Sequence, residues 1–348
     1  MMMHRRLLST TVAKCNKVVM SGIQPTGVPH LGNYFGFVEN WLRLQKTEPA
    51  DTQLFLCVVD WHAITTGPLP AVELRDNVRK MVAGLVAAGV DCKRTVLFRQ
   101  SAVPEHAELT WLLGCLETTA RLQRMPQYKD KSLQYKKGDV PVGLLTYPIL
   151  QAADVLIYRG THVPVGDDQT QHMHIVTDLA DHFNKQYKCE FFPKPLKMAS
   201  ALARVKSLRD PTKKMSKSDP DARSRIELSD TVQTVREKCK KALTDTESVV
   251  TFEMDRRPAV GNLVLLYAAV AGLSPDQVVK EMSSVTTGEF KLRLAECISQ
   301  RFEPIRQRYE ELLASPDTIN AILEDGAAKA RPIAKSNMDE IKRIAGFS

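Results

Sequence analysis

The amino-acid sequence predicts an α/β protein, with a Rossmann-like doubly wound parallel sheet followed by a C-terminal α-helical domain. Three observations lead to this prediction. Short apolar runs alternate with stretches of helical period through residues 17–220, as in consecutive β-α units. Strand-like runs stop after Pro220, and helical patterns fill the rest. A chain of 348 residues with 43% hydrophobic residues is long enough for two domains with a sizeable core.

Each element of the first part is predicted from its own pattern. The runs KVVMSGI and QLFLCVV are apolar and continuous, as in strands buried on both faces. Apolar residues at 31, 35, 38 and 42 share one helical face. A later helix is closed by glycine, and the next begins at proline. The expected order is a strand at 17–23, a helix at 31–45, a strand at 53–59, a helix at 71–89, a strand at 95–99 and a helix at 104–118.

The pattern changes in the second part of the chain. Residues 125–140 are rich in lysine and lack periodicity, so we expect a loop over the edge of the sheet. Helices are expected at 143–158 and after Asp168, and a strand that includes Val205 comes next. Beyond Pro220 helical patterns cover 228–242, 262–271 and 290–313. We therefore divide the chain into a leader at 1–16, a Rossmann domain with a connecting insertion at 17–220 and a helical domain at 221–348.

Cysteine content and the length of the apolar runs argue against several classes of protein. The seven cysteines are an odd number, and none has C-x-x-C spacing, so we expect reduced thiols and no zinc site. The apolar runs fall far short of the roughly 20 residues that span a bilayer, so no membrane span is expected.

Positive charge is concentrated in the first part of the chain. The net charge is +8, and residues 1–220 carry 29 lysines and arginines against 20 acidic residues, whereas residues 221–348 carry 19 against 20. Such a surplus allows a polyanionic partner, although it can also serve solubility alone. The first 38 residues contain no acidic residue, and MMMHRRLLSTTVAK is basic and hydroxylated. This composition is typical of a mitochondrial transit peptide, with an ordinary cytosolic N-terminus as the alternative.

Two stretches carry the chemistry. The first, QPTGVPHLGNYFG, joins the first strand to the first helix. Its glycines let the backbone approach a ligand, and the helix that begins near His30 directs free N–H groups towards it. These are the properties of a phosphate site, although the stretch is neither G-x-G-x-x-G nor a Walker loop. The second stretch, TKKMSKSDP at 212–220, places three lysines between two Asp-Pro turns. Alone, it is most simply a solvated loop.

Together these stretches resemble the paired signatures of the class I aminoacyl-tRNA synthetases. The ordered motifs GIQPTGVPHLGNY, GLLTYPILQAAD, VPVGDDQ and DPTKKMSKSDP are similar to those of the tryptophanyl-tRNA synthetases, and the resemblance runs from Val18 to the C-terminus. Asn33 stands where the general signature has its second histidine, as is common in the tryptophanyl enzymes. Gln151 stands where bacterial members often have methionine, which favours the mitochondrial branch.

The resemblance implies that ATP activates L-tryptophan as tryptophanyl-adenylate, and that the tryptophan then passes to the terminal adenosine of tRNA(Trp). It implies that ammonium groups on the mobile loop stabilise the leaving pyrophosphate, and the implied catalytic residues are Lys214, Lys217, Ser216 and, from the loop opposite, Lys131. Lys213 is expected to be a solvated neighbour. Magnesium would be held mainly by the phosphates, without protein ligands.

The remaining ATP contacts are also implied by resemblance. The implied ATP-binding residues are Gln24, Gly32, Asn33, Gly166, Asp167, Asp168, Val205, Lys214, Met215, Ser216, Lys217 and Ser218. Asp167 and Asp168 also stand where they could cap the following helix.

The amino-acid pocket is expected on the helix at 143–158. Tyr147, Gln151 and Asp154 would share one face of that helix, which could be a solvated face but has apolar neighbours. By resemblance Tyr147 and Gln169 bind the ammonium group of the substrate. Asp154 would accept a hydrogen bond from the indole N–H, since that group can only donate. His62 is expected beside the pocket, or as a structural histidine.

The resemblance further implies a homodimer in the mitochondrial matrix, with an anticodon-binding role for residues 221–348. A tyrosyl-tRNA synthetase shares the fold and the chemistry and remains an alternative. A nucleotidyltransferase would share the first turn only, and the helical domain argues against it. A non-catalytic RNA-binding relative would have little reason to keep both Lys214 and Lys217 together with Asp154.

Overall fold

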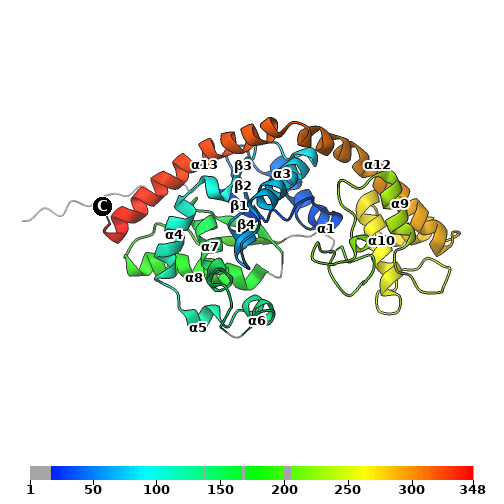
Figure 1. Ribbon diagram of the computed structural model, residues 1–348, viewed down its shortest axis with the longest axis horizontal. Helices are drawn as coiled ribbons and strands as arrows, with labels where there is room; N and C mark the ends of the chain where they lie inside the picture. Colours follow the sequence, from blue (N-terminus) through cyan, green and yellow to red (C-terminus); the bar gives the residue numbers. More distant parts are fainter. Residues whose placement is uncertain (1–16, 137, 167–168, 200–204, 348) are drawn as a thin grey trace, which may run out of the picture.

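The computed structural model describes residues 17–136, 138–166, 169–199 and 205–347. The predicted leader at 1–16 and the predicted ATP ligands Asp167 and Asp168 lie outside the described residues. Figure 1 shows a sheet with helices on both faces, a separate group of helices at the opposite end, and two long helices that arch across both parts.

The sheet has five parallel strands and confirms the predicted fold class. The strands are β1 (Val18–Ile23), β2 (Gln53–Val58), β3 (Val96–Arg99), β4 (His162–Val165) and β5 (Leu196–Ala199). Their spatial order is β3-β2-β1-β4-β5, and every neighbouring pair is parallel. The order reverses between β1 and β4, so a ligand site is expected at the carboxyl ends of these strands.

Alternate residues of the strands belong to two different cores. On β2, Leu54, Leu56 and Val58 face one core, whereas Phe55 and Cys57 face the other, as the period of two requires. The first core contains α3 (Ala71–Ala87) and the second contains α4 (Glu105–Gly114), α7 (Val142–Leu156) and α8 (Thr170–Gln186). These helices confirm the elements expected at 71–89, at 104–118, at 143–158 and after Asp168.

The first helix departs from its predicted form. It consists of α1 (Leu31–Asn33), a π-helical turn at Tyr34–Val38 and α2 (Glu39–Thr47). Leu42 is only partly buried, whereas Trp41 and Leu44 are buried. A single α-helical face cannot continue through a π turn, because the wider turn changes the rotation between residues.

Two other local predictions are wrong. The segment 125–140 is not a plain loop: after α5 (Thr119–Leu122) it contains α6 (Pro126–Ser132), which starts at a proline whose fixed φ suits the first helical position. Val205 lies in none of the five strands. Its neighbour Lys206 instead pairs with Lys214 in an isolated antiparallel bridge, so this segment joins the mobile loop rather than the sheet.

The C-terminal part of the described chain contains helices and no strand of the sheet, as expected. The helices are α9 (Val232–Lys240), α10 (Pro258–Ala271), α11 (Pro275–Glu281), α12 (Thr287–Leu313) and α13 (Pro316–Ala345). α9 begins later than the predicted residue 228 because the Thr231 side chain caps its first turn. Within the described ranges no single helix is long and apolar enough to cross a membrane; only α10 and α11 together meet that criterion, and they are bent by 100°.

The long helix α13, which the sequence patterns did not identify, returns to the sheet and packs against the edge strand β3 (Figure 1). A Cβ atom at Gly326 would lie 1.8 Å from the backbone oxygen of Leu97, so only glycine allows this approach. Further along, Asn337 Nδ2 donates to the carbonyl oxygen of Ile157 at 2.7 Å. The last helix is therefore held against the edge strand at Gly326 and against the end of α7 at Asn337.

Candidate active site

The turn after β1 is closed by two reciprocal hydrogen bonds. His30 Nδ1 accepts from the backbone N–H of Asn33 at 3.2 Å, and Asn33 Oδ1 accepts from the backbone N–H of His30 at 3.1 Å. Burial, reinforced by Arg225 and Lys217, lowers the pKa of His30 to about 4. His30 is therefore a neutral cap at physiological pH. The backbone N–H groups of His30, Leu31 and Asn33 are all donated within the protein.

The mobile loop lies against this turn. Lys217 Nζ donates to the backbone oxygen of Thr26 at 2.7 Å. A Cβ atom at Gly27, where φ is +90°, would lie 2.5 Å from that nitrogen, and one at Gly32 would lie 3.2 Å from the Met215 Cβ. Burial lowers the pKa of Lys217. The structure thus brings Thr26, Gly27 and Gly32 of the turn against Met215 and Lys217 of the loop.

The rest of the loop is held by its own backbone. Met215 N–H donates to the Val205 oxygen at 3.2 Å, so Val205 supports the loop from its preceding segment. Ser216 and Ser218 share a hydrogen bond of 2.9 Å between their hydroxyl oxygens. Lys213 is 74% exposed and pairs with Asp210, as expected for a solvated neighbour.

Lys131 lies at the other side of the site. Its Nζ is 5.8 Å from the centroid of the Tyr147 ring, a cation–π distance. The contact recorded for Lys131 is therefore with the predicted amino-acid pocket, and its role at the phosphates stays a prediction.

Asp154 is buried and accepts three hydrogen bonds from side chains. Its Oδ1 accepts from Gln100 Nε2 at 2.6 Å and from His106 Nδ1 at 2.7 Å. Its Oδ2 accepts from His62 Nε2 at 2.9 Å. Burial alone would raise the pKa of Asp154, but the bonds from the two histidines outweigh it and hold the pKa well below its usual range. The carboxylate is therefore ionised, and Oδ2 retains capacity for one more donor.

Tyr147 stands on the same helix, two turns before Asp154. Its hydroxyl donates to Gln127 Oε1 at 3.0 Å and lies 2.7 Å from His172 Nε2. Burial raises the pKa of Tyr147 to about 12, so the phenol stays protonated. Its ring meets that of His62 edge-on at 6.4 Å. His62 thus contacts two of the predicted pocket residues, Tyr147 and Asp154.

The other predicted pocket residues lie on neighbouring elements. Gln151 is half-buried on α7, between Tyr147 and Asp154. Gln169 takes the N-cap position of α8, and its backbone N–H donates to the Gly166 oxygen at 3.1 Å. The turns after β1, β2 and β4 therefore all contribute residues to one edge of the sheet, where α/β proteins bind ligands.

Sequence reasoning missed two residues of the Asp154 network, Gln100 and His106. One signal was available for Gln100, because it directly follows the expected strand at 95–99, at the carboxyl edge. His106 gave no such signal, since a histidine in the first turn of a helix is unremarkable. It is fully buried, and its Nε2 lies 2.9 Å from the Tyr158 hydroxyl.

The chemistry of this edge has two halves. One half offers a glycine-rich turn that a ligand can approach closely, with the ammonium group of Lys217 beside it, which suits a polyphosphate. The other half offers a buried ionised acceptor and a phenol for a substrate that carries donors. Among the described residues no group of three histidine, cysteine, aspartate or glutamate side chains is arranged to hold a metal ion.

Comparisons with known proteins show the family to which this chain belongs. Residues 14–303 match the family model described as tRNA synthetases class I (W and Y). The mitochondrial tryptophan–tRNA ligase of Caenorhabditis elegans is 49% identical over 98% of this chain and 94% of its own length. The tryptophan–tRNA ligase of Halalkalibacterium halodurans is 41% identical over 95% of this chain and 98% of its own.

Solved structures give the same result. The tryptophanyl-tRNA synthetase of Mycoplasma pneumoniae superimposes with a TM-score of 0.85 at 30% identity, over 96% of this chain and 98% of the other. The enzyme from Campylobacter jejuni, complexed with ADP and tryptophan, superimposes with a TM-score of 0.80 at 30% identity, over 94% of this chain and 99% of the other.

Proposed function

Because this chain belongs to the class I tRNA synthetases for tryptophan and tyrosine, and has the activity of a tryptophan–tRNA ligase, we propose how its own residues perform that reaction. The reaction joins L-tryptophan to the α-phosphate of ATP and releases pyrophosphate, and then transfers the tryptophan to the terminal adenosine of tRNA(Trp). The observation that carries the proposal is the contact of Lys217 with the glycine-rich turn at Thr26.

The first step needs alignment and charge stabilisation rather than a general base, because the attacking carboxylate is already ionised at neutral pH. The proposed ATP contacts are Gln24, Gly32 and Asn33 at the turn, Gly166, Asp167 and Asp168 after β4, and Val205. When pyrophosphate leaves, Lys217 exchanges the Thr26 oxygen for a phosphate oxygen, and Lys214 acts beside it. Ser216, Ser218 and Met215 complete the loop, and Lys131 approaches from α6.

The second part of the proposal concerns tryptophan. Oδ2 of Asp154 accepts one bond from His62, so it can accept the indole N–H as well. The three bonds that Asp154 already accepts fix its position, which makes it a selective acceptor. Tyr147 and Gln169 bind the substrate ammonium, and Gln151 lies between them and Asp154.

Magnesium is proposed to be held mainly by the phosphates of ATP. The ion would neutralise charge on the pyrophosphate, and the lysines of the loop would act on the remaining charge.

A homodimer is proposed from the resemblance to the family. Trp111 on α4 is 75% exposed and Val142 at the start of α7 is 73% exposed, on helices that pack together. Contiguous exposed apolar surface can mark an interface, so Trp111 is a site at which to test the proposal. Light scattering of the wild type and of Trp111→Glu tests this, since a monomeric wild type would contradict it.

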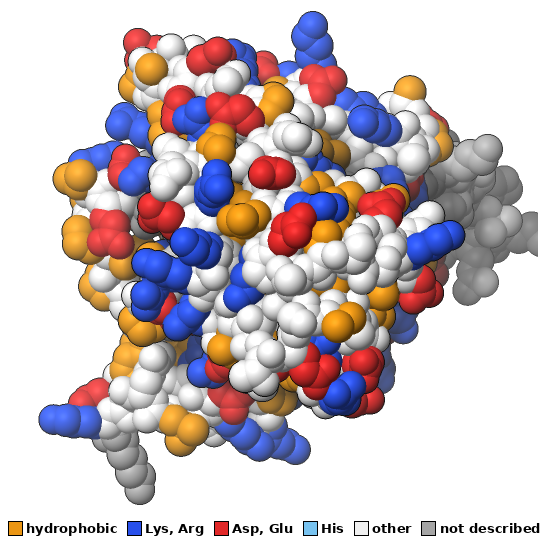
Figure 2. All heavy atoms as spheres, turned by 90° about the vertical axis from the view of Figure 1, so that its right-hand side faces the viewer, with side chains coloured by type: hydrophobic (Ala, Val, Ile, Leu, Met, Phe, Trp, Pro, Cys, Tyr) orange, Lys and Arg blue, Asp and Glu red, His pale blue; other side chains and the backbone are white. Residues whose placement is uncertain are grey.

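Residues 221–348 are proposed to bind the anticodon region of tRNA(Trp). Figure 2 shows lysine and arginine side chains interspersed with acidic ones on this face of the molecule. Lysine and arginine side chains can contact the phosphates of RNA, and the proposal itself rests on the resemblance.

The proposed location is the mitochondrial matrix, with residues 1–16 as the transit peptide. A mitochondrial relative at 49% identity supports it, together with the acid-free composition of residues 1–38. A fusion of residues 1–30 to a fluorescent protein should enter mitochondria. Diffuse fluorescence in the cytosol would contradict the transit peptide.

The activity itself is tested by exchange of labelled pyrophosphate into ATP, with each amino acid supplied in turn. We expect exchange that depends on tryptophan and fails with tyrosine. Exchange with tyrosine alone would show a tyrosyl enzyme, and no exchange with any amino acid would show a non-catalytic relative.

A further inference from the structure

One arginine of the helical part is enclosed by aromatic rings at the base of the ATP turn. The guanidinium carbon of Arg301, on α12, lies 5.5 Å from the ring centroid of Tyr34, 5.2 Å from that of Phe35 and 5.7 Å from that of Phe302. The three rings also contact one another edge-on. The Arg301 side chain is 29% exposed, and a partly desolvated cation is attracted to aromatic faces more strongly than one at an open surface.

The same guanidinium binds two other helices. Its Nη1 donates to the carbonyl oxygens of Ala269 and Val270, at 2.7 and 2.9 Å, near the C-terminal end of α10. Carbonyl groups at a helix C-terminus lack helical partners and carry partial negative charge. Its Nη2 donates to Glu39 Oε1 on α2 at 2.5 Å. One planar group therefore joins α10, α12 and the helix that carries the ATP turn.

The segment that Arg301 contacts is the π-helical turn at Tyr34–Val38, which follows Asn33 directly. A π turn has poorer intrinsic stability than an α turn, so surrounding contacts must hold it. On its N-terminal side, Asn33 closes the capping box with His30. A shift of this turn would therefore move the backbone of Gly32 and Asn33 relative to the loop.

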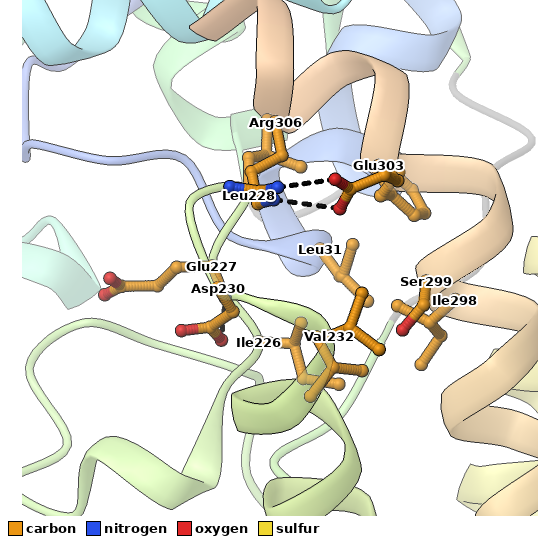
Figure 3. A pocket seen from close by; sticks show the side chains of 12 residues that line it. Leu31, Ile226, Glu227, Leu228, Asp230, Val232, Ile298, Ser299, Glu303 and Arg306 are labelled. Carbon is orange, nitrogen blue, oxygen red and sulfur yellow. Dashed lines mark hydrogen bonds and ion pairs between the residues drawn. The ribbon is translucent and has the colours of Figure 1, made fainter. Parts of the chain in front are cut away.

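A pocket lies close to the segment that Arg301 contacts. A pocket with about 270 Å³ of empty space, part of it open to solvent, lies between Leu31 of the turn helix, the segment at 226–232 and α12 (Figure 3). The Ser299 hydroxyl is buried there without a hydrogen-bond partner among the described residues. Leu31 is fully buried on this side, so apolar packing and the Arg301 contacts hold the turn together.

We propose that Arg301 is a positioning residue for ATP, which sets the turn of Gly32 and Asn33 relative to the helical part. It acts through Tyr34, Phe35 and Glu39 and does not touch the substrate. The inference rests on the proposed ATP role of that turn. The tryptophan pocket lies on α7 and α8, which have no recorded contact with Arg301, so its loss should affect ATP and tryptophan unequally.

The test is pyrophosphate exchange by Arg301→Lys, with the Michaelis constants for ATP and for tryptophan measured separately. Lysine keeps the charge but cannot reach two carbonyl groups and a carboxylate as a planar fork does. We expect the KM for ATP to rise on the order of tenfold, because small misplacements of a binding group have large kinetic effects. The KM for tryptophan should stay within about twofold, which a general loss of structure would not produce.

Arg308→Lys is the matched control. Arg308 is two turns further along α12, is 56% exposed and pairs with Glu311 on its own helix, so both constants should stay at wild-type values. If Arg301→Lys does not fold, Glu39→Gln provides the second variant, since it removes the negative charge that strengthens the contact at 2.5 Å and leaves the two carbonyl contacts in place. It should raise the KM for ATP about threefold.

Three results would overturn the inference. A folded Arg301→Lys with unchanged KM for ATP would show that the turn does not need this group. Equal rises in both constants would show a general structural role. If Arg301→Lys is unfolded, an unchanged KM for ATP in Glu39→Gln would show that the turn does not need the contact between Arg301 and Glu39. Failure of the wild type to exchange would instead refute the proposed function.

Discussion

Replacing Asp154 by asparagine tests how the pocket selects its substrate. The side chain keeps its size, and Oδ1 can still accept from Gln100 and His106. The amide nitrogen takes the place of Oδ2, so a donor now faces the incoming indole N–H. His62 can adapt by presenting a lone pair, because a neutral histidine can exchange its tautomer.

The structure sets the expected size of the effect. A hydrogen bond to a charged group contributes about 1.5–3 kcal/mol, and the opposing donor is left unsatisfied at a cost of about 1–3 kcal/mol. Together they predict a loss of roughly 3–5 kcal/mol in transition-state binding, or two to four decades in kcat/KM for tryptophan. The KM for ATP should change less than about twofold, because the phosphate half of the site is separate.

The assay is pyrophosphate exchange with tryptophan and with phenylalanine. Phenylalanine lacks the indole donor, so its binding to the wild type leaves an acceptor position of the buried carboxylate unpaired, which disfavours it. The variant lacks that acceptor position, so the ratio of kcat/KM for tryptophan to kcat/KM for phenylalanine should decrease. In urea, the free energy of unfolding of the variant should be lower by about 1–3 kcal/mol, because the hydrogen bond between residue 154 and His62 must rearrange.

Asp60→Asn is the matched control. Asp60 is buried near the carboxyl end of β2 and accepts from Ser101, so the same change alters stability without touching the proposed indole site. Asp60→Asn should leave the discrimination between tryptophan and phenylalanine unchanged. If Asp154→Asn also keeps wild-type discrimination, the indole is recognised elsewhere and Asp154 only holds the two histidines.

Three further predictions concern the loop, the last helix and pH. Lys217→Ala should lower kcat for activation by about 10²-fold with little change in the KM for tryptophan. Lys213→Ala, on the same loop but exposed, should leave kcat unchanged. Equal losses of kcat in the two variants would refute the role of Lys217 in stabilising pyrophosphate. Gly326→Ala should lower the free energy of unfolding by about 1–3 kcal/mol in urea, because its Cβ would overlap the Leu97 oxygen, and an unchanged midpoint would contradict that contact. The pKa of His30 is about 4 when folded against about 6.5 when unfolded, so the unfolded chain binds the proton more readily and stability falls as pH drops through that interval. Wild type should lose about 2 kcal/mol more than His30→Gln between pH 7 and pH 5, and parallel curves would show that His30 is not buried neutral.

The sequence allowed the sheet to be predicted because each strand is a continuous apolar run with a helix after it. β2 has two buried faces, so its pattern QLFLCV cannot be mistaken for a half-exposed strand. The glycine-rich turn was predictable for a related reason, since Gly27 adopts a positive φ that other residues avoid.

What could not be predicted depends on contacts between distant segments. The π turn at Tyr34–Val38 needs Arg301, which is far away in sequence, and no local pattern shows it. The environment of Asp154 combines groups from three separate segments, so its polar spacing gave the helix face but not its partners Gln100 and His106. The resemblance implied a strand that includes Val205, yet its backbone oxygen accepts from Met215 of the loop.

The contact between α13 and β3 has a consequence for the order in which the molecule is built. β3 is an edge strand, and its cover is the last helix of the chain. Until that helix has docked, the outer edge of the sheet stays open to other chains. Closure by a segment so distant in sequence is slow, because the intervening chain must be brought together first. The folding chain is therefore most prone to edge-to-edge aggregation before α13 reaches β3.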